Sequence, residues 1–69
     1  MTDHVYKTIE ITGSSQDGVT QAIDRAVGKA GETVRGLDWF EVTEIRGHIE
    51  DGTVAHFQVG LKVGFRMDA

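Results

Sequence analysis

The dipeptide Asp51-Gly52 separates two stretches that each have the alternating pattern of a β-strand. Asp-Gly is a strong signal for a two-residue hairpin turn, because both central positions of that turn need a positive φ. After the dipeptide, one residue in two is apolar, and this set is Ala55, Phe57, Val59, Leu61, Val63 and Phe65. Before it, Phe40 and Val42 match the same face. The second half of the chain is therefore predicted to form a β-hairpin with one apolar face.

A strand and a helix are predicted before the hairpin. Residues 5–12 alternate as a strand, and apolar residues then recur every three or four positions over a helix of about 15–35. Ser14 and Asp17 have the spacing of a capping box at its start, and Gly36 is placed to end it. The apolar stripe of the helix consists of Val19, Ala22, Ile23, Ala26, Val27, Ala30 and Val34.

The predicted order of elements is β-α-β-β. Because the helix reverses the chain, the first two strands run in the same direction and the last strand runs against both. A fully antiparallel sheet then requires the last strand in the middle, with the helix on its apolar face. The fold class is therefore α+β, with a three-stranded antiparallel sheet wrapped on one helix.

The small size of the chain predicts self-association. A chain of 69 residues buries only ~60% of its unfolded surface, and this one has no cysteine for disulfides or thiolate metal sites. Each hairpin arm, at up to about 12 residues, would reach ~40 Å and overhang a helix of ~30 Å. The sheet face away from the helix also carries Trp39, Ile45 and Ile49 among polar groups. We expect this overhanging sheet to pack against copies of itself.

Composition argues against several classes of function. With a net charge of −4, the chain lacks the positive electrostatic field that nucleic-acid binding needs. There is no secretory signal and no apolar run long enough for a membrane span, so we expect a cytoplasmic protein. His48 and His56 fall on opposite faces in the ideal hairpin register, so no metal site is expected. No Ser/His/Asp grouping indicates an enzyme.

Trp39 begins the strand after the helix, and in the ideal register it faces Gly64. The indole could simply cover the glycine and complete the sheet surface, or it could be a flat platform for a planar ligand. Gln58 would face Ile45 on the same side as Trp39; it could be solvated, or its amide could bind the edge of a heterocycle. About six residues, or ~20 Å, separate Trp39 from Gln58. One ligand that touches both must therefore lie between subunits.

Four segments, taken in this order and spacing, resemble a bacterial dodecin, and the resemblance covers residues 5–66. The segments are Leu37-Asp38-Trp39-Phe40-Glu41-Val42, Ile45-Arg46-Gly47, His56-Phe57-Gln58-Val59 and Val63-Gly64-Phe65-Arg66. The resemblance implies a single dodecin-like domain over residues 1–69. It further implies a flavoprotein whose twelve subunits form a hollow shell, hold flavins in pairs between subunits and store them without catalysis.

The resemblance also assigns roles to individual residues. Trp39 would stack on the isoalloxazine ring, and Gln58 would hydrogen-bond its pyrimidine edge. Arg46 and Asp38 would help to hold the flavin, which is usually FMN in bacterial members, with riboflavin as the other candidate. In the ideal register Arg46 points away from the Trp39 face and would pair with Glu44 or another chain. Its role in the site therefore requires a bulge, a curled strand or a neighbouring chain.

Some bacterial dodecins also bind coenzyme A, and the resemblance implies a second set of contacts for it. These positions are Tyr6, Lys29, Arg35 and Arg66. Where relatives can carry further basic residues late in the helix, this chain has Glu32. Coenzyme A is therefore a secondary expectation, and the flavin site is unaffected.

The function expected from the resemblance is flavin storage, in which the indole quenches the photochemistry of bound flavin. A different class is a structural or protein-interaction oligomer, in which Trp39 packs at a subunit interface and flavin binding is incidental. A flavin-dependent enzyme is a third class, but no acid or base for a substrate stands out beside the expected site.

Overall fold

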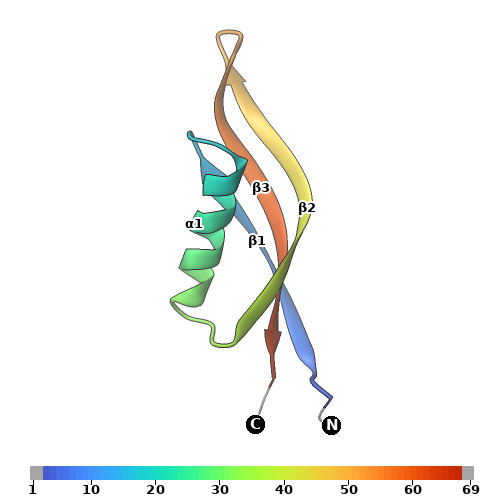
Figure 1. The fold of residues 1–69 in the computed structure, drawn as a ribbon. Coiled ribbons are helices and arrows are strands. Elements are labelled where there is room, and N and C mark those ends of the chain that lie inside the picture. The colour runs from blue at the N-terminus through green and yellow to red at the C-terminus, as the bar shows by residue number, and fades with distance from the viewer. Residues whose placement is uncertain (1–2, 68–69) are drawn as a thin grey trace.

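The computed structural model describes residues 3–67, which form one helix and three strands (Figure 1). The elements are β1 (Tyr6–Ser15), α1 (Val19–Gly31), β2 (Leu37–Glu50) and β3 (Thr53–Arg66). The sheet order is β1-β3-β2, and both neighbouring pairs are antiparallel. The predicted α+β fold with the last strand in the centre is confirmed. Among these residues, no helix has the length and apolar character needed to cross a membrane.

The hairpin turns at the predicted dipeptide. Asp51 and Gly52 have φ values of 52° and 79°, the left-handed conformations that match the twist of the flanking strands. Each arm has 14 residues, or ~46 Å, whereas the 13 residues of α1 span only ~20 Å. The tip of the hairpin therefore projects beyond the helix, as Figure 1 shows.

The core lies between α1 and the central strand. Ala22 and Ala26 of the helix are buried against Val59, Leu61 and Val63, three members of the predicted apolar set of β3. Alanines on the helix allow this close approach. Gly13 of β1 allows it too, because a Cβ there would lie 2.1 Å from the carbonyl oxygen of Ala22. The middle of the predicted apolar set of β3 therefore forms the core with Ala22 and Ala26 of the predicted helix stripe, and Val19, Ile23 and Val27 of that stripe pack against it.

The predicted start of the helix is wrong. β1 continues through Ser14 and Ser15, which pair with β3, and the helix begins only at Val19 with Gly18 as its N-cap. No side chain caps the helix. Instead, the backbone N–H of Asp17 donates to Ser15 Oγ at 3.0 Å. The regular hydrogen bonds of the sheet outcompete the capping box, because they satisfy the backbone of these residues in a longer ladder.

The helix also ends earlier than predicted, at Gly31. The backbone N–H groups of residues 32–34 bond back to the carbonyl oxygens of Lys29 and Ala30, which closes the last turn. Gly36 then reverses the chain into β2 with a φ of 79°, and its carbonyl oxygen accepts from the Arg66 N–H at 3.1 Å. Gly36 therefore joins the helix connection to the end of β3 instead of capping the helix.

Candidate functional site

Three irregularities in the pairing of β2 with β3 decide which side chains share a face. The register shifts between Leu37 and Trp39, between Val42 and Glu44, and between His48 and Ile49. Each shift leaves one extra residue in one strand, as in a β-bulge. Because side chains alternate along a strand, a shift of one residue moves the following side chains to the other face.

The first shift separates Leu37 from Trp39. Leu37 pairs with Phe65 and packs against the core, whereas Trp39 pairs with Gly64 on the opposite face. The indole lies directly across the glycine, since a Cβ on Gly64 would be 2.2 Å from Trp39 Cε2. Trp39 nevertheless remains 40% exposed. The predicted Trp39–Gly64 pairing is confirmed, and the ring is both a cover for the sheet and an accessible aromatic surface.

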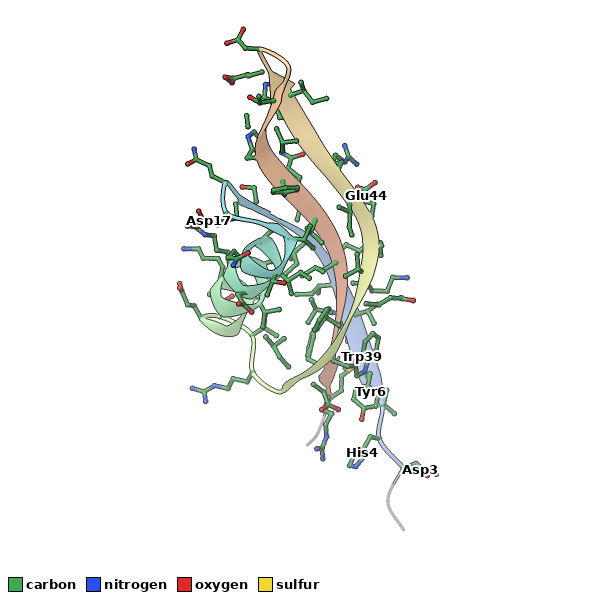
Figure 2. All side chains as sticks on the ribbon, turned by 45° about the horizontal axis from the view of Figure 1, so that its top comes forward. Asp3, His4, Tyr6, Asp17, Trp39 and Glu44 are labelled. Carbon is green, nitrogen blue, oxygen red and sulfur yellow. The ribbon has the colours of Figure 1, made fainter. Side chains whose placement is uncertain are left out.

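Two further rings lie beside Trp39 on this face. Tyr6 meets the indole edge to face, with ring centroids 6.3 Å apart and planes at 61°. His4 meets Tyr6 in the same manner at 6.4 Å and 65°. Figure 2 shows the three side chains in a row toward the N-terminal end of β1. Edge-to-face contacts of this kind are favourable and orient the indole on the glycine.

The second shift, at Thr43, shows that the predicted pairing of Gln58 with Ile45 is wrong. Gln58 faces Arg46 and not Ile45, while Ile45 pairs with Val59 on the helix side of the sheet. The ideal register was wrong here because it allowed no extra residues, whereas Thr43 is extra in β2 and Ala55 is extra in β3. Arg46 therefore shares a face with Gln58. Gln58 and Gly64 are six residues apart in β3 and lie on the same face, so Trp39, which pairs with Gly64, lies on that face too. A bulge was one of the three features that could bring Arg46 to the Trp39 face, and it is the one that the structure shows.

Arg46 is held by an ion pair on this face. Its Nη2 donates to Oε1 of Glu44, the residue directly after the bulge. Figure 2 labels Glu44 on β2. Glu44 in turn lies over Gly60, where a Cβ would be 2.9 Å from Glu44 Cγ and from Thr43 Oγ1. Both charged side chains stay accessible, at 60% for Arg46 and 51% for Glu44.

The side chains predicted to bind flavin fall into two separate groups. Trp39 and the exposed Asp38, which is the extra residue of the first bulge, lie at the Gly64 end of β3. Arg46 and Gln58 lie six residues along, which is ~20 Å away. Trp39, Arg46 and Gln58 share a face, but one chain does not bring the predicted residues of a flavin site around one ligand.

The third shift overturns the predicted placement of the two histidines. His48 and His56 are paired directly across the strands, with stacked rings whose centroids are 5.4 Å apart at 24°. The reason is that the extra Ala55 in β3 and the extra Thr43 in β2 enclose a stretch in which each partner is offset by one residue from the ideal register. His48 Nε2 also lies 3.7 Å from Glu50 Oε2. Within residues 3–67, no group of three or more His, Cys, Asp or Glu side chains could hold a metal ion.

The positions associated with coenzyme A are only partly brought together. Tyr6 pairs with Arg66 across β1 and β3, and the Arg66 backbone bonds to Gly36, the residue after Arg35. These three positions therefore lie at one end of the sheet. Lys29 lies in the last turn of the helix, where its Nζ is 3.6 Å from Glu32 Oε1.

Proteins of known family have the same fold and a similar sequence. The family model of the dodecins matches residues 5–68. The chain belongs to the dodecin family. It is 50% identical over 64 residues to the dodecin of Thermus thermophilus, and the match covers 93% of each chain. The family is one of small flavin-binding proteins, and the resemblance noted in the sequence is confirmed.

Solved dodecin structures agree with the fold over the whole chain. Streptomyces coelicolor dodecin superposes with a TM-score of 0.93 at 58% identity, covering 100% of this chain and 99% of the other. Streptomyces davaonensis dodecin gives the same TM-score at 48% identity, covering 99% and 100%. The β-α-β-β arrangement of this chain is therefore the dodecin fold.

Proposed function

We propose that this protein stores flavin, holding FMN or riboflavin in pairs between the subunits of a hollow dodecamer and quenching their photochemistry. One observation carries the proposal. An exposed indole lies across Gly64 on the same sheet face as a paired Arg46 and Gln58, but ~20 Å from them. A ligand that uses both groups must therefore lie between chains.

The side chains on this face fit the chemistry of a flavin. The Trp39 ring offers an apolar plane for the isoalloxazine system, and stacking of this kind contributes ~0.5–1.5 kcal/mol beyond area burial. The Gln58 amide carries both donors and an acceptor, as the pyrimidine edge requires. Arg46 and Asp38 are exposed beside these two groups and would help to hold the ligand. When bound, the flavin would supply a chromophore that the indole quenches by electron transfer.

Assembly is supported by apolar side chains that one chain leaves uncovered. The helix packs on β1 and β3, so the helix-side residues of β2 stay accessible: Phe40 is 49% exposed and Ile45 is 58% exposed. Val42 lies between them and is also exposed. Such a row is more apolar than a monomer usually leaves in water, and it continues the sheet core. The proposal places the assembly in the cytoplasm and assigns it storage rather than catalysis, in keeping with a family of binding and storage proteins.

Coenzyme A is a second ligand within the proposal. Tyr6, Arg35 and Arg66 lie at one end of the sheet and would supply ring and cationic contacts. Lys29 already has an acidic neighbour in Glu32, so it would have to exchange that partner to contribute.

A titration of FMN with the purified protein tests the proposal, with flavin fluorescence as the readout. Strong quenching that saturates near one flavin per chain would support paired flavins against Trp39. Unchanged fluorescence at micromolar protein would contradict it. Trp39 would then be an interface residue, and the chain would be a structural or protein-interaction oligomer in which flavin is incidental.

A further inference from the structure

Arg46 is the cationic side chain beside Gln58 on the proposed flavin face, but its charge is already shared. Glu44 Oε1 accepts a hydrogen bond from Arg46 Nη2, and both side chains are more than half accessible to solvent. A phosphate that approaches Arg46 therefore meets a carboxylate bound to the same guanidinium. The phosphate must displace the carboxylate or bind beside it.

The position of Glu44 is set by the sheet itself. Glu44 and Arg46 are two residues apart in β2 and therefore share a face, and the bulge at Thr43 turns both onto the face of Trp39 and Gln58. Gly60 lies opposite Glu44, and its missing side chain leaves the space that the Glu44 stem occupies. The bulge thus decides on which face the ion pair lies, and Gly60 leaves the space for the Glu44 side chain.

FMN and riboflavin differ in the charge that this pair would meet. Both carry the same ring system, but FMN has a terminal phosphate and riboflavin has a hydroxyl. Arg46 attracts the phosphate and Glu44 repels it, whereas neither charge discriminates strongly for a neutral hydroxyl. Resting on the proposed function, we propose that Glu44 is a specificity-determining residue. It limits the preference of the site for FMN over riboflavin by competing with phosphate for Arg46.

The test compares the Kd values of both flavins in matched variants. Glu44→Gln removes the competing charge and keeps the shape of the side chain. The expected ratio of riboflavin Kd to FMN Kd rises about two- to fivefold, the size of effect that one exposed ion pair produces. Glu41→Gln is the control, because Glu41 lies on the same strand and face but pairs with Lys62. It changes the net charge equally and should leave the ratio close to the wild-type value.

A double-mutant cycle shows whether the effect passes through Arg46. In an Arg46→Ala background, Glu44→Gln should no longer raise the ratio, since no guanidinium remains to be released. Arg46→Ala alone should weaken FMN binding more than riboflavin binding. Circular dichroism and the elution volume of each variant would establish that the fold and the assembly are retained.

The outcomes separate this inference from the proposed function. If wild type binds riboflavin but Glu44→Gln and Glu41→Gln change the ratio equally, the role of Glu44 is wrong and flavin storage stands. A rise that persists without Arg46 would also overturn it, because the effect would then be general repulsion. If wild type binds neither flavin, the proposed function fails, and the inference fails with it.

Discussion

Arg46 lies directly opposite Gln58 across the β2–β3 pair, because Thr43 is an extra residue in β2 and Ala55 is an extra residue in β3. The bulge at Thr43 reverses the faces of the later residues of β2 relative to Trp39. As a result, a cation and an amide stand together on the face that presents Trp39, and Ile45 moves to the apolar side. The predictions below test this face and the packing that supports it.

Replacing Trp39 should weaken flavin binding and quenching in separable ways. Trp39→Ala removes the stacking surface, so FMN Kd should rise about two- to tenfold, which corresponds to ~0.5–1.5 kcal/mol of stacking. Trp39→Phe keeps a ring but not the electron-rich indole, so it should retain more affinity than alanine and lose most of the quenching. Fluorescence titration gives both quantities. A Trp39→Ala protein that binds and quenches FMN like wild type would contradict the stacking role.

Adding a methyl group under the indole should have a similar effect on binding. In Gly64→Ala the new Cβ would lie 2.2 Å from Cε2 of Trp39, so the ring must move off the sheet. We expect FMN affinity to fall as in Trp39→Ala, measured by the same titration. Gly28→Ala is the control, because a Cβ at that exposed helix position meets nothing within 4 Å. Equal FMN affinity in wild type, Gly64→Ala and Gly28→Ala would show that the position of the indole does not affect binding of the ligand.

The contact between β1 and the helix should be intolerant of any side chain at Gly13. A Cβ there would lie 2.1 Å from the Ala22 carbonyl oxygen, which is backbone and cannot turn aside. Gly13→Ala should therefore lower the free energy of unfolding by at least ~1–3 kcal/mol, the usual cost of overpacking a core. Gly28→Ala should instead raise it by ~0.5–1 kcal/mol, because glycine is costly in a helix. Chemical denaturation measures both, and a neutral Gly13→Ala would contradict the packing described for α1.

The stability of the chain should depend on its concentration. Phe40 and Ile45 are about half exposed in the single chain, and association would cover such residues only in the folded form. Serial dilution should therefore lower the melting temperature, as followed by circular dichroism. Sedimentation at each concentration would report the oligomer present. An unchanged melting temperature in a demonstrable monomer would show that one chain is stable by itself.

Most of the fold follows from local patterns in the sequence. The alternation around Asp51-Gly52 specifies the hairpin, and the apolar stripe through Ala22 and Ala26 specifies the covering helix. The helix ends were predicted less well. Ser14 carries a helix-capping signal in the sequence, but its backbone is used by the sheet. Whether Ser14 caps the helix or extends the strand depends on its pairing with Gln58, which lies more than forty residues away in the sequence.

The sequence by itself determined the elements, their order, the Trp39–Gly64 pairing and the family. The sequence also offered Glu44 as a partner of Arg46, and the structure shows that pair. Only the tertiary structure decided that Arg46 joins Gln58 and that His48 stacks on His56. The physical reason is the bulge at Thr43. A β-branched residue fits a regular strand as well as a bulged one, so its sequence carries no local signal for the shift. The shift becomes visible only when two complete strands are paired, and it then changes the face of every side chain beyond it.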